Sequence, residues 1–310
     1  MDIQDRKGLK QAAAEHLSGA SYDPKKLILI HNGVLVALSL LLALIHFLLE
    51  QRIGDTGGLG GLGTRAILET LQAILSIAQM TAVVFWQIGY VFVALRVHRG
   101  ESIGPGSLLE GFRRFGPVLR LRLLTGALYF GLTMASAYVA SIIFTLTPWS
   151  RPLMEAYTIG TQEALLAALE ECMLPMYVLV GVVALVLVIP LYYQLRLADY
   201  AVMDRGRVGA LMAVQVSRVL MRGRRVALLK LDLSFWWFYV LEILTLVLSF
   251  GDQILPLMGV ELPWSADAWY YIFLALCYVC QLALYWWRGN EVLVTYAGFY
   301  DALMPKDEEE

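Results

Sequence analysis

Polar side chains interrupt several long apolar runs, and these residues could do chemistry inside a membrane. An ionisable group at the centre of a membrane-spanning helix costs roughly 2.5–3.5 kcal/mol on insertion scales, so it is a functional candidate. Glu242 lies between Leu241 and Ile243 in such a run. It would serve either as a hydrogen-bonded structural carboxyl or as a site for a cation or a proton.

Polar residues also recur at helical spacing between residues 69 and 90. They fall within a stripe about 80° wide at about 100° per residue, which must face other helices or a hydrated path. We expect Gln79, Glu242 and Gln281 to approach one another near mid-membrane. The candidate intramembrane polar site comprises Glu242, Gln79, Gln281, Gln72, Gln87 and Glu69.

The remaining residues with chemical capacity give weaker patterns. His31 and His46 are too far apart for paired ligands on one helix, and Cys277-x-x-Cys280 lies in an apolar run rather than at an accessible helix start. The glycine-rich segment 54–63 has no strand before it, so we expect an exposed hairpin and not a phosphate-binding loop. No protease, esterase or nucleotide-binding motif occurs. We therefore expect no enzyme activity, no cofactor and no metal.

The elements that position these residues are long apolar runs. The chain of 310 residues is 59% hydrophobic and 16% charged, whereas soluble domains contain about 25% charged residues. A membrane-spanning helix needs about 20 mostly apolar residues. The sequence predicts an all-α membrane protein with six spans: Leu27–Leu49, Ala66–Leu95, Val118–Thr147, Cys172–Leu197, Leu233–Leu255 and Ala268–Trp287.

Charge distribution predicts the orientation of these spans. Of the 24 Lys and Arg residues, 21 fall in the N-terminal segment, in alternate loops and in the C-terminal tail. Because basic residues concentrate on the cytoplasmic side, we expect both termini in the cytoplasm of a multi-pass protein of the cell membrane. The first apolar run is expected to remain as an anchor, since no cleavable signal precedes it.

The basic segments share an order of amphipathic stretch, glycine and cations before a span. The glycines are Gly19, Gly116 and Gly223, each expected to end a helix at positive φ. The spacing predicts three repeat-like units in one domain 1–310, at about 1–98, 99–204 and 205–304, with an acidic tail 305–310. The alternative is that any loop before a span looks alike. Candidate headgroup-binding residues are Arg113, Arg114, Arg120, Arg122, Arg218, Arg222, Arg224 and Arg225.

The C-terminal third carries a resemblance to a known family. Ser217-Arg218-Val219-Leu220-Met221-Arg222-Gly223 and Leu231-Asp232-Leu233-Ser234-Phe235 precede Ala297-Gly298-Phe299-Tyr300. This order resembles an uncharacterised family of bacterial integral membrane proteins, domain of unknown function 975. The family's usual Pro-Tyr is replaced here in the neighbourhood of Gly289-Asn290-Glu291. The resemblance implies six helices and a cell-membrane location, and it implies no activity.

Two functional hypotheses follow from these patterns. The first is a non-enzymatic membrane protein that binds lipid, or a partner membrane protein such as a second copy of itself, through its helix bundle. The second is a small transporter or channel for a solute, an ion or a lipid, with the mid-membrane polar residues along its path. We expect membrane lipids as partners and no nucleic acid.

Overall fold

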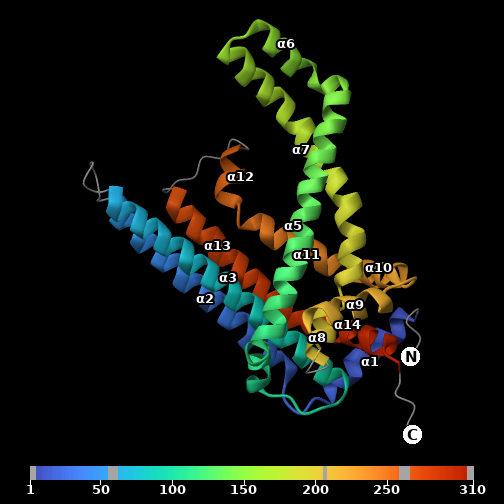
Figure 1. Ribbon diagram of the computed structural model, residues 1–310. Helices are drawn as coiled ribbons and strands as arrows, with labels where there is room; N and C mark the ends of the chain where they lie inside the picture. Colours follow the sequence, from blue (N-terminus) through green and yellow to red (C-terminus); the bar gives the residue numbers. More distant parts are fainter. Residues whose placement is uncertain (1–4, 55–61, 205–207, 258–265, 306–310) are drawn as a thin grey trace. The chain divides into compact units, whose positions relative to one another are not determined.

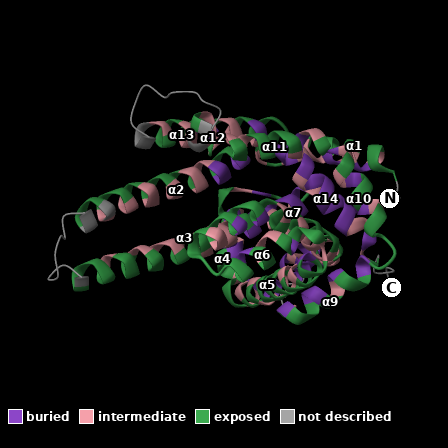
Figure 2. Cartoon of the chain, turned by 90° about the horizontal axis from the view of Figure 1, so that it is seen from above, coloured by how far each residue is buried: buried purple, intermediate pink, exposed green. Residues whose placement is uncertain are grey.

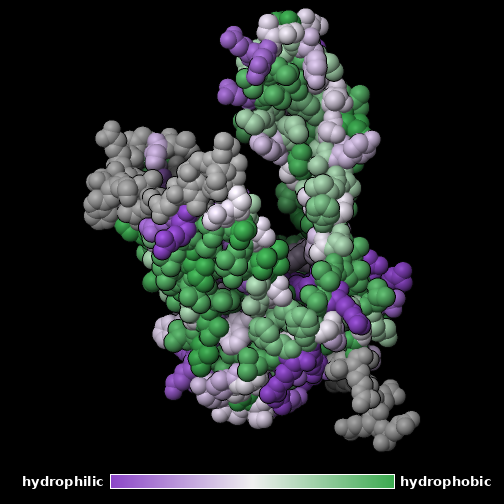
Figure 3. All heavy atoms as spheres, turned by 60° about the vertical axis from the view of Figure 1, so that its left-hand side comes forward, coloured by the Kyte–Doolittle hydropathy of each residue, from purple (hydrophilic) through white to green (hydrophobic). Residues whose placement is uncertain are grey.

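The computed structural model describes residues 5–54, 62–204, 208–257 and 266–305, and these ranges are helical and contain no strand (Figure 1). Five helices are long and apolar enough to cross a membrane, and there are six such spans if one bent pair counts as a single span. Hydrophobic side chains cover much of the surface of the long helices (Figure 3), as a surface facing lipid requires. The glycine-rich segment lies mostly outside the described residues.

Two compact units make up the chain, and each is described by itself. The first contains Met1–Phe115, Met203–Gly206 and Val226–Glu310, and the second contains Gly116–Val202 and Arg207–Arg225. The helices of unit 1 are α1 (Arg6–Ser18), α2 (Pro24–Gly54), α3 (Leu62–His98), η2 (Pro105–Leu109), α4 (Glu110–Arg113), α10 (Arg225–Ser234), α11 (Trp236–Leu248), α12 (Gly251–Leu257), α13 (Ala266–Leu284), the π-helical segment η4 (Tyr285–Gly289) and α14 (Asn290–Leu303). Those of unit 2 are α5 (Phe115–Leu146), η3 (Pro148–Ser150), α6 (Arg151–Ile159), α7 (Gln162–Leu195), most of α8 (Ala198–Asp204) and α9 (Ala210–Leu220).

Helix α14 forms the centre of unit 1. It is buried over most of its length, including the large side chains of Tyr296, Phe299 and Tyr300. It packs against α1 and α3, and Figure 2 shows buried residues gathered around it, whereas the far parts of α2 and α3 are largely exposed. Burial of such side chains stabilises a fold by about 1.5–3 kcal/mol each. Unit 1 is therefore held together at the end where α1 and α14 meet.

Charged groups at the ends of the core helices are paired. Arg99 donates to both carboxylate oxygens of Asp301, at 3.0 and 2.6 Å, and to Asp204 at 2.5 Å. The hydrogen bond with Asp301 is the largest cause that raises the pKa of Arg99. Tyr300 Oη donates to Asp204 at 3.1 Å. Bidentate pairing of this kind fixes geometry as well as charge, so α3 and α14 are locked in register.

Two glycines allow α3 and the segment η2–α4 to approach closely. A side chain at Gly89 of α3 would overlap the backbone carbonyl of Leu108, and one at Gly111 of α4 would overlap the carbonyl of Phe85. Backbone atoms cannot move aside as cheaply as the end of a flexible side chain. This contact therefore requires a residue without Cβ on both sides.

The predicted span Leu233–Leu255 does not correspond to one straight helix. Helices α10 and α11 meet at Phe235 with a bend of 68°, and α11 ends at Leu248, before α12 begins. Lys10 of α1 donates to the carbonyl of Ser234 at 2.9 Å and lies 3.7 Å from the centre of the Phe235 ring. The bend thus exposes a carbonyl that a distant lysine satisfies.

Burial lowers the pKa of the Lys10 ammonium, with Glu291 opposing that effect. Arg6 donates to the carbonyl of Lys230 at 3.4 Å. Two cations of α1, Arg6 and Lys10, therefore bond the backbone of α10. At least part of the basic character of the N-terminal segment has this structural use.

The three amphipathic stretches form different structures. The first is the single helix α1, the second is the short pair η2 and α4, and the third is α9. The expected positive φ occurs at Gly223 (φ 75°), whereas Gly19 has φ −91° and Gly116 lies inside α5. The glycine prediction was therefore wrong at two positions. The repeat-like units stay a prediction.

Candidate functional site

One of the predicted intramembrane residues lines a cavity in unit 1, and a second bonds a residue that lines it. Gln281 of α13 lines a cavity of about 120 Å³ together with Asn32, Ser39 and Tyr278. Gln79 of α3 donates from Nε2 to Ser39 Oγ at 3.3 Å. Helices α2, α3 and α13 each contribute to this polar cluster, which we call the α2–α3–α13 cavity.

Glu242 has a different partner. Its carboxylate accepts a hydrogen bond from Tyr285 Oη at 2.7 Å, and it is not among the residues that line the cavity. Tyr285 opens the π-helical segment η4 one helical turn after Gln281. Glu242 therefore contacts the chain one helical turn after Gln281, the residue that lines the cavity. Tyr285 was not among the residues that the sequence predicted to approach Glu242, so this role was missed.

The rest of the predicted stripe disperses along α3. Glu69 is exposed and pairs with Arg65 at 2.8 Å, and Gln87 is exposed. Gln72 is half-buried, and its backbone carbonyl accepts from Ser76 Oγ at 2.9 Å. Of this stripe, Gln79 donates to Ser39, which lines the α2–α3–α13 cavity.

A second polar cluster, missed from the sequence, joins α2, α3 and α14. Asn290 accepts a hydrogen bond from Tyr90 Oη and donates from Nδ2 to the carbonyl of Pro24 at 2.9 Å. Trp86 donates to the carbonyl of His31 at 2.8 Å. Asn290 begins α14 directly after the π-helical segment. These bonds satisfy buried polar groups, so the cluster is a structural element of the core.

Four of the eight predicted headgroup residues have partners within the protein. Arg114 donates to Glu110 and to the carbonyl of Met203, and Arg122 pairs with Asp199 at 2.9 Å. Arg113 pairs with Glu110 at 3.3 Å. Arg225 donates to the side-chain amide oxygen of Gln194 at 2.7 Å.

The other four arginines belong to unit 2. Among the described residues, no hydrogen-bond or ion-pair partner contacts the side chains of Arg120, Arg218, Arg222 and Arg224, and all four are exposed.

Helix α9 and the start of α5 place these four side chains at the same end of unit 2. Ser217 of α9 accepts from the backbone N–H of Leu197 at 3.2 Å and donates to the carbonyl of Gln194 at 2.7 Å. Arg122 holds the start of α5 to the start of α8 through Asp199. The outer face of α9 exposes Leu211 and Val219 at 68% and 73%. Unpartnered cations beside exposed apolar side chains are typical of a surface that lies against lipid headgroups.

Within the described ranges, no group of three or more His, Cys, Asp or Glu side chains is arranged to hold a metal ion. Cys277 is buried and Cys280 half-buried in α13. Burial surrounds this pair with apolar atoms, which is typical of packing.

The fold and these clusters define an all-α protein with helices of membrane-spanning length and composition. The chain belongs to the family described as protein of unknown function (DUF975), whose model matches residues 1–288. The match covers the N-terminal helices as well as the motifs around Ser217 and Asp232 that suggested the family. No curated protein and no solved structure matches the chain.

Proposed function

We propose that the protein is a non-enzymatic membrane protein that binds anionic phospholipids of the inner leaflet. The observation that carries this proposal is the set of four exposed arginines without a partner among the described residues: Arg120, Arg218, Arg222 and Arg224. An arginine near an anionic membrane surface contributes about 1 kcal/mol of attraction. Arginines already paired with carboxylates would contribute less, because a headgroup would have to replace an existing bond.

The proposed orientation places this surface in the cytoplasm of the cell. Basic residues favour the cytoplasmic side. In addition, the packing of α1 against α14 supports the proposal that both ends of the described chain lie on the same side. An even number of crossings satisfies this contact, which supports counting the bent pair α10–α11 as one span.

The test compares two double variants of the full chain. We expect R218Q/R222Q to retain less phosphatidylglycerol than the unmodified chain after purification from mixed phosphatidylglycerol and phosphatidylcholine nanodiscs. Loss of two contacts at about 1 kcal/mol each predicts a weakening of about tenfold or more. Lipid retained per chain is measured by mass spectrometry.

The matched control is R52Q/R151Q, which removes two exposed arginines that also have no partner within the described ranges. These residues belong to the weakly basic loops. Equal loss of phosphatidylglycerol in both double variants would contradict a localised site. Retention that does not decrease at high salt would contradict the electrostatic origin.

A second candidate function is passage of protons or cations through the bundle, and the α2–α3–α13 cavity favours it. Asn32, Ser39, Tyr278 and Gln281 surround a volume of about 120 Å³, which is ample for water molecules, since one needs about 10–15 Å³. Amides and hydroxyls inside an apolar bundle also serve as interhelical contacts. Flux measurements distinguish a conducting cavity from interhelical contacts.

A further inference from the structure

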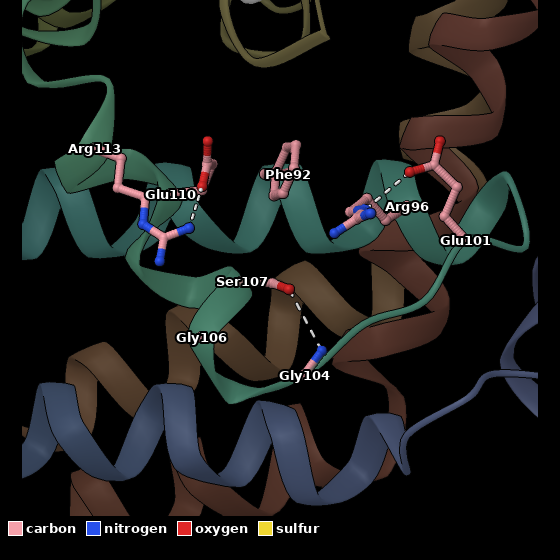
Figure 4. Close-up of a pocket in the computed structure, with 8 residues that line it drawn as sticks. All are labelled: Phe92, Arg96, Glu101, Gly104, Gly106, Ser107, Glu110 and Arg113. Atoms are coloured by element: carbon pink, nitrogen blue, oxygen red, sulfur yellow. Dashed lines mark hydrogen bonds and ion pairs between the residues drawn. The ribbon is translucent and has the colours of Figure 1, made fainter.

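A pocket at the end of α3 in unit 1 combines both signs of charge. It has a volume of about 480 Å³ and is lined by residues of α3, η2, α4 and the connecting loop: Phe92, Arg96, Glu101, Gly104, Gly106, Ser107, Glu110 and Arg113. This volume falls within the range of about 300–1,000 Å³ that small-molecule sites occupy. Figure 4 shows Phe92 between the Arg96–Glu101 and Glu110–Arg113 pairs, with the stretch of chain that carries Gly104 and Gly106 across the pocket.

The pocket is held open by its own local structure. Ile103, before the loop, is buried, and its backbone N–H donates to Ser21 Oγ at 3.0 Å. Gly104 donates to Ser107 Oγ at 3.4 Å. The close contact at Gly89 and Gly111 fixes α4 against α3. The charged side chains are therefore presented by anchored elements.

Donors remain for a ligand at both ends of the pocket. Among the described residues, Arg96 gives only Nε to Glu101, at 2.8 Å, which leaves its two terminal nitrogens available. Arg113 contacts Glu110 at a long 3.3 Å, and its side chain is 69% exposed. A guanidinium carries five donors in a planar fork that matches a phosphate. Both arginines can therefore contact a phosphate without breaking the Arg96–Glu101 bond.

The two carboxylates restrict the choice of ligand. A simple phosphate would meet Glu101 and Glu110 as repelling charges, and a simple amine would meet the two arginines. A ligand with a phosphate and a primary ammonium a few atoms apart satisfies both kinds of group at one end, with the phosphate at Arg96 and the ammonium at Glu101. We infer that this pocket binds a phosphoethanolamine group.

Exposed apolar side chains beside the pocket fit a phosphoethanolamine that belongs to a lipid. Leu109, Phe112 and Phe115 are 46%, 38% and 50% exposed on the segment that forms the pocket wall. They can contact acyl chains while the headgroup occupies the pocket. This site lies in unit 1 and uses none of the four arginines of unit 2, so it is independent of the proposed function.

Lipid competition tests the inference on the full-length protein in detergent. We expect short-chain phosphatidylethanolamine to bind about tenfold more tightly than phosphatidylcholine, because a quaternary ammonium cannot donate hydrogen bonds to a carboxylate. The variant E101Q should remove this preference, and R96Q should weaken both lipids. Binding is followed by native mass spectrometry, with unfolding midpoints to establish that both variants fold.

The matched control is R65Q/E69Q, which removes an Arg–Glu pair of the same 2.8 Å separation elsewhere on α3. Equal affinity of the unmodified chain for both lipids would overturn the inference, as would equal loss in this control. Competition by soluble phosphoethanolamine would show that the pocket recognises the headgroup without the acyl chains. Preference for the lipid without such competition would show that the acyl chains contribute, which also supports the site. Phosphatidylglycerol retention, measured in the same samples, reports separately on the arginines of unit 2.

Discussion

The hydrogen bond from Tyr285 to Glu242 joins two residues on neighbouring helices, at 2.7 Å. A bond to a carboxylate contributes about 1.5–3 kcal/mol when ionised, and an amide can accept in its place. A structural Glu242 therefore tolerates replacement by glutamine, because Tyr285 keeps an acceptor. A Glu242 that carries protons does not, because glutamine cannot titrate.

We predict that E242Q leaves stability nearly unchanged, whereas Y285F lowers the free energy of unfolding by about 1–3 kcal/mol. Unfolding midpoints in detergent check this. The control is Y270F, since Tyr270 lies on the same helix and makes no hydrogen bond within the described ranges. A strongly destabilised E242Q would contradict the exchange of acceptors.

The same residues decide the second candidate function. If protons or cations pass through the bundle, E242Q and Q79L should abolish flux in proteoliposomes while the unfolding midpoint stays near that of the unmodified chain. An entrapped pH-sensitive dye reports proton flux. Flux that is absent from the unmodified chain, or unaltered in both variants, would leave these residues with a structural role only.

At this scale, the sequence predicted some partners and missed others for a physical reason. Gln79 and Gln281 were expected near each other because amides avoid lipid. Gln281 lines the α2–α3–α13 cavity, and Gln79 donates to Ser39, which also lines it. Asn290 was missed because its partners, Tyr90 and Pro24, are 200 and 266 residues away. Composition cannot identify such a contact, which depends on how α14 packs.

Between elements, the closest approach is that of α3 and the segment η2–α4. We predict that G89A and G111A each destabilise the protein by about 1–3 kcal/mol, because the added methyl group meets backbone carbonyls. Helix propensity alone would favour alanine over glycine by about 1 kcal/mol, so the overlap must reverse the sign.

Gly33 of α2 supplies the control, since a side chain there meets nothing within 4 Å. G33A should be neutral or stabilising in the same unfolding assay. Equal effects at Gly33, Gly89 and Gly111 would contradict the close contact. Phosphatidylethanolamine binding should also weaken in G111A, because α4 carries one wall of the pocket.

Helix bounds also show what hydropathy can predict. The first four spans were found to within about ten residues at each end, since each is one long apolar helix. In the fifth, hydropathy does not register the bend at Phe235, where the helix direction changes by 68°. The carbonyl at that bend is satisfied by Lys10, more than 200 residues earlier.

For the whole molecule, the number of membrane crossings determines on which side of the membrane each basic segment would lie. The apolar helices number five, or six with the bent pair. Five crossings would put the ends of the chain on opposite sides, which conflicts with the packing of α1 against α14. We propose six crossings, which would keep the ends together and would put every strongly basic segment on one side.

We predict that single cysteines at Ala14, Gln215 and Pro305 are protected from a membrane-impermeant maleimide in intact cells, whereas those at Thr64 and Gln162 react. All five positions are exposed in the structure, so the membrane alone accounts for protection. The native Cys172, Cys277 and Cys280 are replaced by alanine, and permeabilised cells show that each position can react. Labelling at Pro305 but not Ala14 would establish an odd number of crossings, and a fully reversed pattern would place the four arginines of unit 2 outside the cell, away from the inner-leaflet lipids they are proposed to bind.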